Sequence, residues 1–165
     1  MVNHNPQPPG HPAGQQAPDF HDAVSATTPT AVVKAAGGLQ VGAGLLLALS
    51  GVQLLISVTF YKPWMEKVPY AMMLFGIAAM LTGLKTLRMQ GWAALAGTAL
   101  NGLISLLMGY WVMLTLGGGF FSLIASLVPA LALAGTVLGA LSISPALRAD
   151  KARQVLRDSG IDMEF

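Results

Sequence analysis

Cysteine is absent from the chain, and charged residues make up only 10% of its 165 positions. The absence of cysteine excludes disulfide bonds, thiolate nucleophiles and metal sites with cysteine ligands. Soluble domains usually contain about 25% charged residues, so the shortage of charge argues against a soluble fold. The formal net charge is only +2, and the basic residues lie beside apolar runs. That placement indicates membrane topology rather than nucleic-acid binding.

The longest uncharged region runs from Met89 to Leu147, 59 residues without Asp, Glu, Lys, Arg or His. A single helix of that length would extend roughly 88 Å, whereas the hydrocarbon core of a bilayer is about 30 Å thick. The region must therefore turn back on itself. Gly117-Gly118-Gly119 is the only place within it where three helix-breaking residues occur together. The sequence predicts two membrane-spanning helices joined by a tight turn.

We expect an all-α membrane protein, a bundle of four transmembrane helices arranged as two tight hairpins. The predicted spans are residues 36–60, 68–87, 92–116 and 120–143, within a transmembrane domain of residues 34–144. Residues 1–33 are rich in Pro, Gly and Gln and contain too little apolar material to offset the entropy of folding. They are predicted to form a disordered cytoplasmic tail.

A short basic helix and tail are predicted for residues 145–165. Ser144 and Pro145 resemble a helix start, with serine as the N-cap and proline in the first position. This cytoplasmic helix has a weakly apolar face and a basic one. Two placements stay open for it: it lies on the membrane surface, or it projects into water.

The basic residues also predict the orientation, because Lys and Arg near membrane spans are retained on the cytoplasmic side. Four spans place both termini and the second connection on one side of the membrane. That side holds seven basic residues and the opposite side two: Lys34, Lys85, Arg88, Arg148, Lys151, Arg153 and Arg157 against Lys62 and Lys67. We expect both termini in the cytoplasm. The layout is common among bacterial membrane proteins, which favours a bacterial inner membrane.

Small residues recur at steps of three or four in each predicted span, and such faces allow neighbouring helices to approach closely. Pro129 is expected to kink the fourth span, because proline removes a backbone donor and crowds the preceding turn. The candidate residues for packing or polar contacts between helices are Gly42, Gly51, Gln53, Gly76, Gly83, Thr98, Asn101, Gly102, Gly109, Pro129 and Thr136.

Gln53 and Asn101 are the amides expected at depth in the membrane. With a rise of 1.5 Å per residue, Asn101 lies roughly 14 Å above the cytoplasmic end of its helix, level with Thr136. Gln53 lies roughly 26 Å up, so the two amides are not expected to touch. Two interpretations stay open. The polar residues form hydrogen bonds between helices, which we favour, or they line a path for a solute.

No predicted span contains an ionisable residue at depth, a Ser-His pair or a cluster of His and Glu. The histidines His4, His11 and His21 lie in the tail at spacings that match no tight metal motif. We therefore expect no catalytic residue, cofactor or metal, and no motif identifies a family. The sequence favours a non-catalytic membrane protein that packs in the lipid bilayer with itself or with another membrane subunit. The alternative is a small channel or transporter component with a polar path near Asn101 and Gln53.

Overall fold

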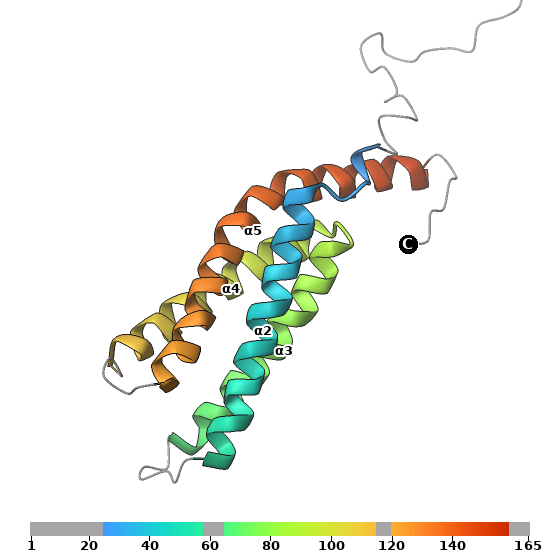
Figure 1. Ribbon diagram of the computed structural model, residues 1–165. Coiled ribbons are helices and arrows are strands. Elements are labelled where there is room, and N and C mark those ends of the chain that lie inside the picture. Colours follow the sequence, from blue (N-terminus) through green and yellow to red (C-terminus); the bar gives the residue numbers. More distant parts are fainter. Residues whose placement is uncertain (1–24, 58–64, 115–119, 159–165) are drawn as a thin grey trace, which may run out of the picture.

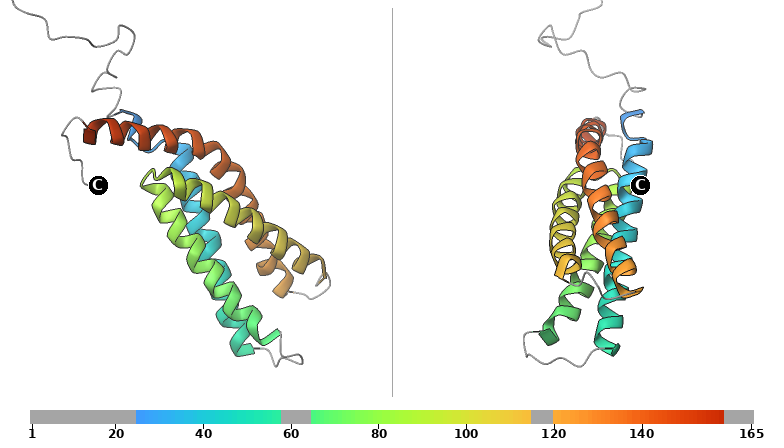
Figure 2. Two further views of the ribbon diagram at one scale, coloured as in Figure 1. Left: turned by 180° about the vertical axis from the view of Figure 1, so that it is seen from behind. Right: turned by 60° about the vertical axis from the view of Figure 1, so that its left-hand side comes forward.

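The computed structural model describes residues 25–57, 65–114 and 120–158. Within these ranges four helices are long and apolar enough to cross a membrane: α2 (Ala31–Ser57), α3 (Val68–Leu87), α4 (Gly91–Leu114) and α5 (Phe120–Asp158). A 3-10 turn, η1 (Met65–Lys67), precedes α3. The helices lie side by side in an elongated bundle, as Figures 1 and 2 show. The predicted all-α class, with four helices long and apolar enough to span a membrane, is confirmed.

The first helix begins earlier than predicted. α2 starts at Ala31 rather than at residue 36, because Thr30 provides its N-cap. The Thr30 hydroxyl accepts a hydrogen bond from the Val33 N–H at 3.4 Å, and its carbonyl accepts one from the Lys34 N–H at 3.0 Å. Residues 31–33, predicted as the end of a disordered tail, are therefore helical. Residues 1–24 of that tail, the end of the first predicted span and the Gly117–Gly119 turn lie outside the described residues.

α3 covers the same residues as the second predicted span, 68–87, with Pro69 in its first turn. Proline fits there because the first N–H groups of a helix have no partner within it. α4 begins at Gly91, one position before the third predicted span. The start of α3 is therefore marked by a signal within its own sequence.

α5 is one continuous helix of 39 residues, so the predicted separate helix beginning at Ser144-Pro145 is wrong. Pro145 lies inside α5, and Ser142, Ala146 and Ala149 around it are fully buried. This packing on both sides of the proline offsets the loss of one backbone hydrogen bond. In Figure 1 the C-terminal part of α5 turns away from the direction of the part that precedes it, the kind of bend that an internal proline causes.

α2 and α3 pack together through glycines that recur every seven residues on α2, at Gly37, Gly44 and Gly51. The two backbones approach so closely that no side chain fits between them. A Cβ atom at Gly44 would lie 2.5 Å from the carbonyl oxygen of Gly76, and one at Gly51 would lie 2.7 Å from that of Pro69. We call this contact the glycine seam; it is formed by Gly37, Gly44 and Gly51 of α2 and by Pro69, Gly76 and Gly83 of α3.

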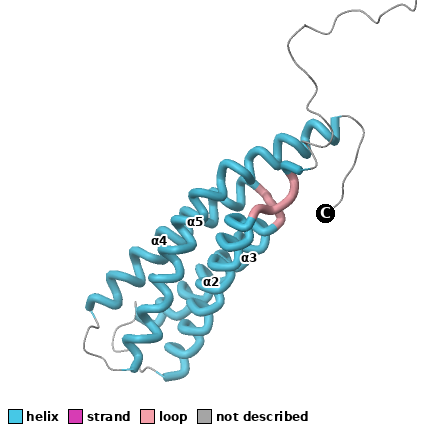
Figure 3. The backbone as a smooth tube through the Cα atoms, turned by 45° about the horizontal axis from the view of Figure 1, so that its top comes forward, coloured by secondary structure: helices cyan, strands magenta, loops and turns pink. Residues whose placement is uncertain are grey.

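The apolar core joins all four helices and consists of small and branched side chains: Ala43, Leu47, Ala79, Ile104, Val128 and Ala132. A second cluster, Val33, Met89 and Ala149, joins the start of α2 to the α3–α4 turn and to the C-terminal part of α5. Figure 3 shows that turn beside α5. Only 22% to 39% of the residues in each apolar segment are buried, so most of the helical surface faces outward.

Candidate functional site: polar contacts between the helices

Fully buried polar side chains from α2, α3 and α4 lie close together inside the described bundle. Gln40 and Thr86 are fully buried, and the Thr86 hydroxyl lies 3.2 Å from Gln40 Oε1 and donates a hydrogen bond to it. The amide of Gln40 also lies against Gly97 of α4 and Gly139 of α5. A Cβ atom at Gly97 would lie 2.7 Å from Gln40 Oε1, and one at Gly139 would lie 3.3 Å from Gln40 Nε2. Gln40 therefore contacts all three other helices.

Asn101, also fully buried, lies one turn along α4 from Gly97. Its Nδ2 donates a hydrogen bond to the carbonyl oxygen of Gly97 at 2.9 Å. Its Oδ1 accepts no hydrogen bond within the described part of the chain, and Gln40 Nε2 donates none. An unpaired buried polar atom costs about 1–3 kcal/mol, so each requires an explanation. Together with Thr86 and Thr98, Gln40 and Asn101 form what we call the polar layer.

Several predicted polar residues make contacts within or between α4 and α5. Thr98 donates a hydrogen bond to the carbonyl oxygen of Ala94, in its own helix, and lies directly against Gly139. The Thr136 hydroxyl likewise bonds within its own helix, and its methyl group faces Gly102. The carbonyl oxygen of Pro129 accepts a hydrogen bond from the Ser105 hydroxyl at 3.2 Å, which joins α4 to α5.

Besides Gly102, which faces Thr136, the other five predicted glycines divide into two groups. Gly51, Gly76 and Gly83 lie in the glycine seam, where a Cβ atom would meet backbone atoms at 2.5–2.9 Å. Gly42 and Gly109 have nothing within 4 Å of a Cβ position, so a side chain at either one would point into open space beside the described helices.

Gln53 is exposed, whereas Asn101 is buried inside the bundle, so these two residues do not share a site. Gln53 lies among outward-facing residues that recur at steps of three or four along α2. We call this surface the α2 outer face, and it consists of Gly38, Gly42, Leu45, Leu49, Val52, Gln53 and Ile56. The amide at depth that sequence reasoning missed is Gln40. The sequence does contain a signal for it. Gln40 lies three residues after Gly37 and four before Gly44, so it is on the same side of the helix as the seven-residue glycine repeat.

The C-terminal part of α5 binds the α3–α4 turn through Asp150 and Arg153, a pair that we call the α5 clamp. Arg153 Nη1 and Nη2 donate hydrogen bonds to the carbonyl oxygens of Met89 and Arg88 at 3.1 and 2.7 Å. Asp150 Oδ2 accepts a hydrogen bond from the N–H of Gly91 at 2.7 Å, which caps the start of α4. The two clamp residues also form an ion pair at 3.3 Å.

Met89 adopts a left-handed backbone conformation, with a φ of 58°, at the end of α3. Two backbone hydrogen bonds close the turn, from Met89 N–H to the Thr86 carbonyl and from Gln90 N–H to the Lys85 carbonyl. Glycine is usual at such a position. Methionine occupies it here, and its buried side chain packs with Val33 and Ala149.

The α5 clamp shows which side of the C-terminal segment packs inside the protein. Ala149 and Leu156, which belong to the weakly apolar face of this segment, are buried in the protein. Arg153, expected on a solvated basic face, binds the turn. The apolar face of this segment therefore serves internal packing.

Across the described residues, no group of three or more His, Cys, Asp or Glu side chains could hold a metal ion. The fully buried polar side chains of the described helices are neutral amides and hydroxyls. No protein-family model, curated protein or solved structure matches the chain.

Proposed function

We propose that the protein is a non-catalytic multi-pass membrane protein that acts by packing with a second copy of itself or with another membrane subunit. The observation that carries this proposal is the α2 outer face. Gln53 on that face is exposed and makes no hydrogen bond to the described residues. An unpaired amide is unfavourable beside lipid tails. A helix packed on this face would give the amide a partner, and Gly38 and Gly42 would let its backbone approach.

Association of the full chain in lipid nanodiscs or mild detergent tests this proposal. The variants Gly42→Leu and Gln53→Leu change the α2 outer face, and Ala134→Leu enlarges an exposed small residue of α5 as the matched control. We expect either α2 variant to weaken association about tenfold and the control to leave it unchanged. Crosslinking in native membranes would distinguish a second copy from another subunit. Association that both α2 variants leave intact would contradict the proposal.

We also propose that both termini face the cytoplasm of a bacterial cell, across its inner membrane, and that α2–α3 and α4–α5 form two hairpins. The cluster of Val33, Met89 and Ala149 supports this orientation. It brings the start of α2, the α3–α4 turn and the end of α5 together, so the basic residues of these segments lie at one end of the bundle.

Single cysteines test the orientation directly, since the chain contains none of its own. Thr28→Cys and Arg157→Cys should be protected from an impermeant maleimide in intact cells, and Glu66→Cys should be labelled. The opposite labelling pattern, or labelling of only one of the two end positions, would overturn the proposed threading.

A small channel or transporter component is the second candidate function, favoured by the unpaired Gln40 Nε2 and Asn101 Oδ1 in the polar layer. A path would pass these two amides rather than Gln53, which is exposed on the outside. Liposomes that contain the protein would then leak small solutes, and Asn101→Leu would stop the leak while leaving assembly intact. Liposomes that do not leak would favour the first proposal, in which the protein acts by packing with itself or with another membrane subunit.

A further inference from the structure

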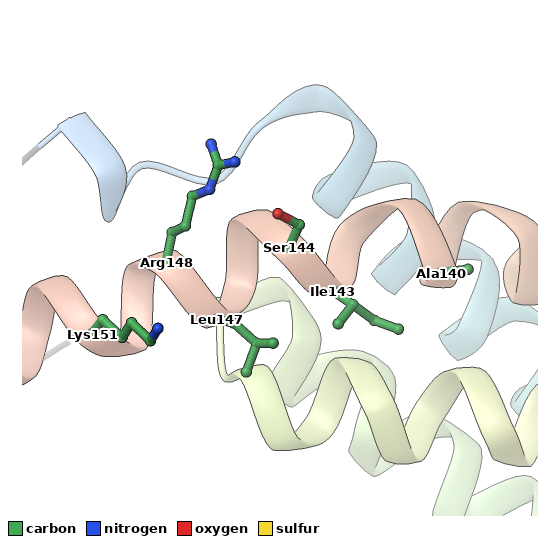
Figure 4. A pocket seen from close by; sticks show the side chains of 6 residues that line it. All are labelled: Ala140, Ile143, Ser144, Leu147, Arg148 and Lys151. Atoms are coloured by element: carbon green, nitrogen blue, oxygen red, sulfur yellow. The ribbon is translucent and has the colours of Figure 1, made fainter.

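A shallow groove of about 450 Å³ runs along α5. Its lining residues recur at steps of three and four, and so lie on one side of the helix: Ala140, Ile143, Ser144, Leu147, Arg148 and Lys151. Figure 4 shows the aliphatic side chains of Ile143 and Leu147, followed along the helix by the basic side chains of Arg148 and Lys151. The groove is therefore apolar along most of its length and cationic at one end.

The cationic end carries charge that the protein does not neutralise. Arg148 and Lys151 are exposed, and neither forms an ion pair within the described ranges. Arg153, in the next turn, differs because Asp150 and two turn carbonyls already bind its guanidinium. Guanidinium and ammonium groups that remain unpaired suit a phosphate oxyanion.

The change from apolar to basic lining coincides with the expected edge of the membrane. Leu147 is the last residue of the long uncharged run, and the roughly 20 residues of helix before it are enough to cross about 30 Å of hydrocarbon. Leu147 also packs against Gly91, next to the exposed Trp92. Tryptophan is enriched where lipid headgroups begin. Two independent features therefore place Arg148 and Lys151 at the depth of lipid phosphates.

We propose that this groove binds one anionic phospholipid. Its phosphate lies between Arg148 and Lys151, and one acyl chain follows Leu147, Ile143 and Ala140 into the hydrocarbon. An anionic headgroup is selected because a zwitterionic one brings its own cation to the two basic side chains. The site does not depend on whether the protein associates with a partner or conducts a solute.

Native mass spectrometry of the full chain in mild detergent tests the headgroup. The probes are phosphatidylglycerol and phosphatidylcholine with identical acyl chains. We expect about tenfold stronger binding of phosphatidylglycerol, reduced to near equality by Arg148→Gln with Lys151→Gln. The control, Lys85→Gln with Arg88→Gln, removes the same charge from exposed residues at the end of α3 and should retain the preference. An equal loss in both double variants would overturn the proposal, because it would indicate diffuse attraction by surface charge.

A second pair of variants tests the acyl chain without changing charge. Ala140→Phe fills the groove, whereas Ala134→Phe enlarges an exposed residue of the same helix outside it. We expect Ala140→Phe to weaken phosphatidylglycerol binding severalfold and Ala134→Phe to leave it unchanged, with unaltered helix content by circular dichroism in both. Full binding by Ala140→Phe would overturn the proposal. Displacement of the lipid by an equal concentration of inorganic phosphate would do the same, because it would indicate a site for free phosphate.

Discussion

The α2–α3 pair and the α4–α5 pair reach close packing by different means. In the glycine seam, backbone faces backbone, and a Cβ atom at Gly44 or Gly76 would lie 2.5 Å from a carbonyl oxygen. Between α4 and α5 the close contacts are made by side chains, such as that of Thr98 against Gly139. A Cβ atom at Gly102 would meet Thr136 at 3.7 Å, and the Ser105 hydroxyl reaches the Pro129 carbonyl. The first contact is fixed by shape and the second by side chains that can adjust.

A bulky residue in the glycine seam should have the largest effect on stability. Gly44→Leu would drive a side chain into the carbonyl oxygen of Gly76 and the amide of Met80, and neither backbone can move without parting the helices. We expect a loss of about 3 kcal/mol or more in the free energy of unfolding. Unfolding in mixed micelles, followed by circular dichroism, measures it. Gly42→Leu is the matched control, two residues away in open space, and equal stability of the two variants would contradict a seam fixed by shape.

Removal of the clamp carboxylate should have an intermediate effect. Asp150→Ala deprives the Gly91 N–H of its acceptor and Arg153 of its ion pair. We expect a loss of about 1–2 kcal/mol, the usual size for a helix cap with a charged partner. Asp158→Ala, at the exposed end of the same helix, should change the same unfolding free energy by far less. If the two alanine variants were equally stable, the α5 clamp would not be holding the turn.

The hydroxyl of Thr86 should contribute less than the clamp. Thr86→Val leaves Gln40 Oε1 without its donor, and we expect a loss of about 1 kcal/mol, typical of a polar contact between membrane helices. Thr82→Val serves as the control, because the Thr82 hydroxyl bonds only to carbonyl oxygens of its own helix. A larger loss from Thr82→Val than from Thr86→Val would mean that the contact with Gln40 adds nothing to stability.

The smallest effect is expected where α4 and α5 leave space. Gly102→Ala places a methyl group 3.7 Å from the Thr136 methyl, an ordinary van der Waals contact. Alanine also favours the helix over glycine by up to about 1 kcal/mol, so stability should stay the same or rise slightly. The same substitution at Gly76 should be clearly destabilising. A comparable loss at both positions would remove the distinction between the two helix pairs.

The four apolar helices could be predicted because long runs without charged residues are visible in the sequence itself. No knowledge of tertiary contacts is needed to find them. The choice of packing faces was only partly predictable. Gly51 and Gly76 lie in the seam, whereas Gly42 faces outward. Small residues spaced three or four apart occur on more than one side of α2, and the spacing alone does not show which side meets a neighbouring helix. The seven-residue spacing of Gly37, Gly44 and Gly51 carries that information and also places Gln40 inside the bundle.

The end of α5 was less predictable, for a physical reason. Ser144-Pro145 has the composition of a helix start, and only the burial of Ala146 and Ala149 keeps the helix continuous through it. The clamp contacts join residues 59 to 65 positions apart, so no local pattern announces them. Local signals predicted the four apolar helices, but tertiary packing decided how the last segment is used.

The α5 clamp has a consequence for the order in which the chain matures. The α3–α4 turn exposes backbone groups at residues 88–91, and their partners are supplied from Asp150 and Arg153. During synthesis from the N-terminus, the middle of the molecule therefore stays incomplete until translation has passed residue 153. A nascent chain stalled before that point would already contain the residues of α2 and α3, but the Gly91 N–H and the carbonyl oxygens of Arg88 and Met89 would still be open to water.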